Sequence, residues 1–125
     1  MCGIVGHLAF QSDYKIGAPL LNSLNQLLMH RGPDSRGTFL KDEIALAMRR
    51  LSIIDLDSGD QPMTSQDGNY TIIFNGEIYN HDSLRADLIK KGYPIKTLSD
   101  TEVLLYSYID KGENSLQDLN GMFAF

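Results

Sequence analysis

The chain of 125 residues has one cysteine, no tryptophan and no excess of positive charge. A single cysteine cannot form an internal disulfide, and the chain lacks the cationic start of a secretory signal, so we expect a reducing, cytoplasmic location. The formal net charge of −5 leaves no basic footprint for nucleic acid, and no such partner is expected. No apolar run is long enough to span a bilayer, so we expect no membrane partner.

Signatures of phosphate and metal binding are missing as well. The 11 glycines form neither G-x-G-x-x-G nor G-x-x-x-x-G-K, the patterns that cradle phosphates. The histidines His7, His30 and His81 lie far apart, and none has metal-ligand spacing with another or with Cys2. We therefore expect no metal at the functional site. A hydrolase that pairs Cys2 with His30 or His81 stays open as an alternative, although His30 is better explained as facing a helix dipole.

The apolar pattern predicts a single α+β domain over residues 1–125, without repeats or linkers. The order of its elements gives little support for a regular parallel sheet. The segment Ser99-Asp100-Thr101-Glu102 fits a capping box, so we expect a helix to begin there and to end at Gly112. The other expected elements are helices over 16–30 and 82–91 and strands over 3–10, 38–40, 44–51 and 70–74.

The apolar run at 121–125 predicts the opening of a further buried strand. Because the chain stops inside this run, we expect a domain that is truncated at its C-terminus. An unpaired apolar strand at a terminus favours association with another chain, so some homo-oligomer formation is also expected.

Cys2 is the most informative residue, because it follows Met1 directly and precedes Gly3. A free α-amino group titrates at about 7.7–8.0 and a thiol at about 8.5. If Met1 is removed, one residue therefore carries both a nucleophile and a base, and no separate histidine is needed. A peptide bond to Met1 would turn the amine into an amide that cannot act as a base. The alternative is that Cys2 is a small apolar residue packed under the first strand.

Asn75-Gly76 follows an expected strand, and two interpretations of it are open. On local grounds it is the commonest hairpin turn, because both residues tolerate positive φ. It could also form an oxyanion hole from the Asn75 amide and the Gly76 N–H, and the two interpretations are compatible.

Arg49 and Arg50 end another expected strand and should point to opposite faces, so that one is solvated and the other could face a pocket. The planar guanidinium pairs with a carboxylate, as recognition of a free amino acid requires. Asp100 and Glu77 could then meet the ammonium end of the same ligand. Taken alone, Asp100 is explained equally well as a carboxylate that stabilises a helix N-terminus.

Seven segments together resemble the class II glutamine amidotransferase domain, which has an N-terminal cysteine nucleophile, in its asparagine synthetase-like branch. They occur in the family's order across nearly the whole chain. These segments are MCGIVG at 1–6, HRGPD at 30–34, RLSIID at 50–55, QPM at 61–63, NGEIYN at 75–80, SDTE at 99–102 and GMFAF at 121–125.

The resemblance implies a four-layer αββα sandwich of two antiparallel sheets, with L-glutamine as substrate and glutamate and ammonia as products. It also implies that the glutaminase site needs no cofactor. Ammonia would pass to a C-terminal synthetase domain, absent from this chain, that uses ATP and magnesium to activate an acceptor carboxylate. The implied alternative is a catalytically inactive module that senses glutamine.

The resemblance also implies residue roles. Cys2 would attack the glutamine amide while its own amine relays the proton, and Asn75 and Gly76 would hold the oxyanion. The implied substrate contacts are Arg50 for the α-carboxylate, Glu77 and Asp100 for the α-amino group, and Leu51 and Ile53 for the pocket wall.

Overall fold

One sheet of the molecule has three antiparallel strands in the order β1-β3-β2. Its register pairs Gly3 with Arg49 on one side of β3 and Lys41 with Ile44 on the other. All three strands lie where the sequence predicts strands, with ends that differ by up to three residues. The computed structural model describes residues 2–10, 14–51 and 59–125, and these strands are β1 (Gly3–Leu8), β2 (Ser35–Lys41) and β3 (Ile44–Arg50).

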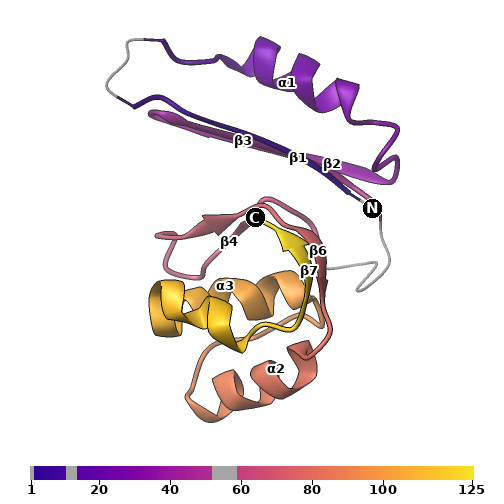
Figure 1. Ribbon diagram of the computed structural model, residues 1–125. Coiled ribbons are helices and arrows are strands. Elements are labelled where there is room, and N and C mark those ends of the chain that lie inside the picture. The colour runs from indigo at the N-terminus through magenta and orange to yellow at the C-terminus, as the bar shows by residue number, and fades with distance from the viewer. Residues whose placement is uncertain (1, 11–13, 52–58) are drawn as a thin grey trace.

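Helix α1 (Ala18–Leu27) covers one face of this sheet (Figure 1). It has a proline in its first turn, where the missing N–H leaves no helical hydrogen bond unmade. Its buried Leu21 belongs to one apolar cluster with Ala45 and Ala47 of β3. Small side chains on the strand leave room for the helix to pack against the sheet. This packing fixes the position of β3 relative to α1.

The second half of the chain forms two short antiparallel strand pairs and a helical layer. Figure 1 shows these strands between the three-stranded sheet and helix α3, with α2 beyond. The strand pairs are β4 (Met63–Thr64) with β5 (Thr71–Ile72) and β6 (Asn75–Ile78) with β7 (Gly121–Ala124), and the helices are α2 (His81–Lys90), α3 (Asp100–Lys111) and the 3-10 helix η1 (Gly112–Asp118).

Helix α3 holds this half together because its first two turns are buried. Leu104 and Leu105 pack in one cluster with residues of β5 and β6, including Ile78. Val103 and Tyr106 pack in another cluster against α2.

Within the described residues the prediction of an α+β fold with antiparallel sheets is confirmed. In that same part of the chain, no helix is both long and apolar enough to cross a membrane.

The structure corrects the expectation for residues 70–78. The expected strand over 70–74 is assigned only at Thr71–Ile72, and Asn75-Gly76 is not a hairpin turn but the beginning of β6. Asn75 pairs with Ala124 and Gly76 with Phe123. A Cβ at position 76 would overlap the backbone of β7, so the glycine is required by this close approach rather than by a turn.

The final strand is also different from the expectation, which was a buried and unpaired strand. β7 exists, but it pairs with β6, and its side chains lie largely at the surface, with Met122 62% and Phe123 38% exposed. Apolar composition alone predicted burial, whereas pairing with β6 satisfies the backbone hydrogen bonds of β7 without covering its side chains.

The capping box at the start of α3 forms on one side only. Ser99 is the N-cap, and its hydroxyl accepts a hydrogen bond from Thr101 N–H at 3.1 Å. Glu102 does not bond back to Ser99; its carboxylate accepts from the N–H groups of Lys96 and Thr97. Gly112 ends the helix at a φ of 58°, as expected.

Candidate active site

A cavity of about 170 Å³ lies where the end of β3, the start of β6 and the first turn of α3 meet. This is comparable to the roughly 150 Å³ cavity that admits benzene in an engineered core, and it suits a small ligand. Every predicted site residue that the structure describes lines it, whereas Ile53 lies outside the described residues. The lining residues are Cys2, Arg50, Leu51, Gly59, Gln61, Phe74, Asn75, Gly76, Glu77, Ser99, Asp100, Thr101 and Met122.

The Cys2 thiol is partly buried beside the end of β3. Its Sγ accepts a hydrogen bond from Leu51 N–H at 3.3 Å and lies 3.6 Å from the Leu51 carbonyl oxygen. The carbonyl of Cys2 accepts from Nε of Arg31 at 3.0 Å. A Cβ at Gly32 would overlap the backbone of Arg49, so only glycine lets the segment after α1 pass so close to β3. These contacts hold the thiol at one wall of the cavity.

Arg49 and Arg50 point to opposite faces of the sheet, as predicted, but the expectation that one is solvated is wrong. Both are buried, with 7% and 5% of their surfaces exposed. Arg49 is turned toward α1, where Nε donates to the Asn25 carbonyl at 3.3 Å and Nη2 to Oε1 of Gln26 at 2.5 Å. Arg50 lines the cavity, and its Nη1 lies 3.6 Å from the exposed carboxylate of Asp60. A buried guanidinium thus forms a cationic wall of the cavity.

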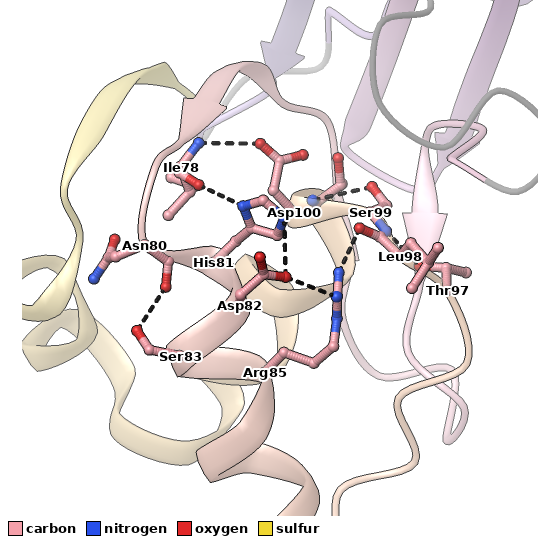
Figure 2. Close-up of polar contacts among 11 residues, drawn as sticks. Ile78, Asn80, His81, Asp82, Ser83, Arg85, Thr97, Leu98, Ser99 and Asp100 are labelled. Carbon is pink, nitrogen blue, oxygen red and sulfur yellow. Dashed lines mark hydrogen bonds and ion pairs between the residues drawn. The ribbon is translucent and has the colours of Figure 1, made fainter.

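Asp100 provides a buried carboxylate at the first position of α3 (Figure 2). Its Oδ2 accepts a hydrogen bond from Ile78 N–H of β6 at 3.0 Å. Burial raises the pKa of Asp100 above its usual value, and the bond from Ile78 and the nearby ring of His81 oppose this rise. Among the ion pairs within residues 2–10, 14–51 and 59–125, none involves Asp100. Burial destabilises a carboxylate, and a cationic ligand group would stabilise it.

Asn75, Gly76 and Glu77 reach the same cavity from consecutive positions of β6. Asn75 is partly buried, whereas Gly76 and Glu77 are exposed. The pairing with β7 fixes the backbone here, so amide donors at 75 and 76 are held on a strand rather than on a flexible turn. Rigid donors of this kind are suited to stabilising a charge that develops during a reaction.

In the described part of the chain, His30 and His81 lie near helix ends, and their rings contact neighbouring residues of the chain rather than Cys2. Nδ1 of His30 lies 3.0 Å from the carbonyl of Leu27, the last residue of α1, which agrees with its expected place at a helix end. Nδ1 of His81 lies 2.8 Å from the Ile78 carbonyl and Nε2 lies 3.5 Å from Oδ1 of Asp82 (Figure 2). Among the described residues that line the cavity, none is a histidine. This geometry gives no support to a pairing of Cys2 with either ring.

A family model described as "Glutamine amidotransferase domain" matches residues 1–125. The chain belongs to this family. Over its whole length the amidotransferase domain is 48% identical to the glutamine-hydrolyzing asparagine synthetase 1 of Bacillus subtilis (strain 168), of which it covers 20%. It is 42% identical to the glutamine-hydrolyzing asparagine synthetase B of Escherichia coli (strain K12), again over its whole length and over 22% of the relative. The chain thus spans about a fifth of the length of these curated relatives.

Several residues that line the cavity had no predicted role in it. Gln61, Ser99, Thr101 and Met122 all lie in segments that carried the family resemblance. The capping-box pattern marks Ser99 only as a helix start, and no pattern singles out the other three, because the importance of an uncharged side chain depends on what it contacts. Gly59 and Phe74 lie outside those segments, and no sequence signal assigns them to the cavity. Within the described residues, no cluster of three or more His, Cys, Asp or Glu side chains could hold a metal ion.

Proposed function

We propose that this domain hydrolyses the side-chain amide of L-glutamine to glutamate and ammonia. The observation that carries the proposal is the shared cavity of a glutamine amidotransferase family member, lined by a cysteine thiol, a buried arginine and a buried carboxylate. A zwitterionic amino acid needs one cation and one anion at fixed positions, and an amide needs a nucleophile at the far end. Arg50, Asp100 and Cys2 supply these three groups.

Recognition in this proposal separates the two ends of the substrate. The guanidinium of Arg50 takes the α-carboxylate, for which its planar geometry is suited. Asp100 and Glu77 take the α-ammonium group. Leu51 and Ile53 contribute backbone and apolar contacts. No cofactor takes part at this site.

The chemical step uses both functional groups of Cys2 once Met1 has been removed. The α-amine takes the thiol proton, and the thiolate sulfur attacks the amide carbon of glutamine. Negative charge develops on the amide oxygen, which accepts hydrogen bonds from the Asn75 side chain and the Gly76 N–H. The carbon–nitrogen bond breaks as the protonated α-amine of Cys2 returns its proton to the leaving nitrogen, which departs as ammonia. The amine then takes a proton from water, whose oxygen attacks the thioester carbon. The carbon–sulfur bond breaks, glutamate is released, and the amine returns the proton to the sulfur of Cys2.

We further propose that residues 1–125 are the glutaminase part of a longer enzyme that resembles asparagine synthetase. In the complete enzyme, a C-terminal synthetase domain with ATP and magnesium would use the ammonia to amidate an acceptor carboxylate. The complete glutaminase domain would be a four-layer αββα sandwich, to which further strands beyond β7 contribute. The working location proposed is the cytoplasm, where the thiol stays reduced. We also propose a homo-oligomer, which the exposed apolar side chains of Met122 and Phe123 support in place of an unpaired strand.

Ammonia release by the full-length protein tests this proposal directly. The wild type with Met1 removed should release ammonia from glutamine, and Cys2→Ala should abolish that release while glutamine still binds. The matched control is Ser23→Ala on the exposed face of α1, which should leave the rate unchanged. Undiminished release by Cys2→Ala would refute the mechanism. Glutamine binding without turnover by the processed wild type would instead identify a sensing module.

A further inference from the structure

The side chain of Gln61 bridges two elements of the cavity from a buried position. Its Oε1 accepts a hydrogen bond from Phe74 N–H at 2.5 Å, and its Nε2 donates to Oγ1 of Thr101 at 3.0 Å. The residue is 9% exposed and Thr101 is 2% exposed, so both bonds are shielded from competing water. Phe74 precedes Asn75, and Thr101 follows Asp100. The bridge therefore joins the residue next to Asn75, proposed to bind the amide end of glutamine, to the residue next to Asp100, proposed to bind its ammonium end.

The backbone of Gln61 is fixed on a third element. A Cβ at Gly37 of β2 would overlap the Gln61 carbonyl oxygen, so the two backbones lie in very close approach. Gly37 pairs with Met48 of β3, the strand that ends in Arg50. Gln61 thus links the sheet that carries the arginine, the segment that leads into β6, and the beginning of α3.

A second contact joins β6 to α3 on the other side of the site. Ile78 N–H, at the end of β6, donates to Asp100. The strand is therefore tied to the first turn of α3 at Ile78 and, through the carboxamide of Gln61, at the residue before Asn75. Two ties at either end of a four-residue strand fix its distance from the helix, which one tie alone would not do.

We propose that Gln61 is a positioning residue that sets the separation between the oxyanion donors on β6 and the ammonium-binding carboxylate on α3. This inference rests on the proposed glutaminase function. Glutamine presents its amide and its ammonium group at a limited range of distances, so the two elements must be held in register with the substrate. A misplacement of about 1 Å can cost about 10²-fold in rate. Both polar atoms of the carboxamide are bonded within the protein, which favours a positioning role over direct contact with substrate.

The first test separates positioning from folding. In the full-length protein, Thr101→Val removes the acceptor for Gln61 Nε2 and keeps the side-chain shape, and Thr101→Ser restores an oxygen. Thr101→Val should raise the KM for glutamine by about 2- to 13-fold, the range for one neutral hydrogen bond, and Thr101→Ser should recover most of it. Gln61→Leu removes both bonds and should lower kcat/KM by about 10²-fold. Because Gln61→Leu leaves a buried N–H without a partner and could fail to fold, the threonine pair is the decisive one.

The discriminating readout uses a substrate without the ammonium group. Glutaramic acid keeps the amide and the carboxylate of glutamine but has nothing for Asp100 to bind. The ratio of kcat/KM for glutamine to that for glutaramic acid should fall in Thr101→Val, because only glutamine depends on the position of Asp100. The control Thr64→Val removes a hydroxyl hydrogen bond of the same 3.0 Å length away from the cavity and should leave the ratio unchanged.

Two outcomes overturn the inference, and they are distinguishable from failure of the proposed function. If Thr101→Val lowers the melting temperature but keeps the wild-type ratio, the bridge is only structural. If Thr101→Ser and Thr101→Val lower the ratio equally, the hydrogen bond is not the cause. If the processed wild type itself releases no ammonia from glutamine, the proposed function fails and this inference fails with it.

Discussion

Asp100→Asn should separate ligand binding from stability, because the two depend on its charge with opposite signs. Asp100 is 6% exposed, and its Oδ2 accepts a hydrogen bond from Ile78 N–H. Burial raises the pKa of Asp100 in the folded protein above its unfolded value. Such a group contributes most stability below the unfolded pKa, and this contribution is lost as pH rises through the folded pKa. Wherever Asp100 is ionised, its burial therefore lowers the free energy of unfolding.

The amide of Asn keeps an oxygen acceptor for Ile78 N–H and cannot ionise. The free energy of unfolding of Asp100→Asn at pH 7, measured by urea denaturation, should equal or exceed that of the wild type. The KM for glutamine should rise because the α-ammonium group loses a charged partner. A hydrogen bond to a charged group contributes about 1.5–3 kcal/mol, which corresponds to an increase of about 10- to 150-fold.

Asp110→Asn at the other end of α3 is the matched control. Its carboxylate pairs with Lys91, whose hydrogen bond lowers the pKa of Asp110, so this charge contributes stability above the unfolded pKa. Asp110→Asn should lose stability and leave the KM unchanged, the reverse of Asp100→Asn. If Asp100→Asn is destabilised while its KM stays at the wild-type value, the carboxylate serves the helix N-terminus and not the ligand.

Two further predictions concern the other walls of the cavity. Arg50→Lys should raise the KM for glutamine about tenfold or more, because an ammonium cannot pair bidentately with a carboxylate. Arg49→Lys should lower the melting temperature and leave the KM unchanged. Equal KM values for the two variants in steady-state assays would contradict the assignment of Arg50 to the substrate carboxylate. Asn75→Ala should lower kcat by about 10²–10³-fold with little change in KM, and an unchanged kcat would remove Asn75 from the oxyanion hole.

The local apolar pattern was sufficient to predict the positions of those strands and helices whose partners are close in sequence. The strands on either side of Asp42, and the helices that end near His30 and Gly92, lie close to their predicted places. Their signals are apolar periodicity and glycine stops, and both act over a few residues. Side-chain chemistry alone made Cys2 and one of Arg49 and Arg50 candidates, and the family resemblance selected Arg50, but neither could show that Cys2 and Arg50 share a cavity.

The incorrect expectations arise where distant partners decide the outcome. Asn75-Gly76 has the composition of a turn, yet pairing with β7, far along the chain, makes it a strand. One of Arg49 and Arg50 was expected to be solvated, because alternation along a strand does not reveal that α1 contacts Arg49 on the far face. Glu102 matches a capping box, but the N–H groups of residues 96 and 97 compete for its carboxylate. In each case a contact between separate elements overrides a correct local preference.

The proposed reaction depends most on the free amino group of Cys2, and one comparison tests this dependence. The full-length protein is purified in two forms, one with Met1 removed and one with Met1 retained by inhibiting methionine aminopeptidase, and mass spectrometry verifies each N-terminus. Both forms should bind glutamine, but the retained form should release ammonia at least about 10²-fold more slowly, because it lacks the base that accepts the thiol proton. Equal kcat values for the two forms would contradict the central claim.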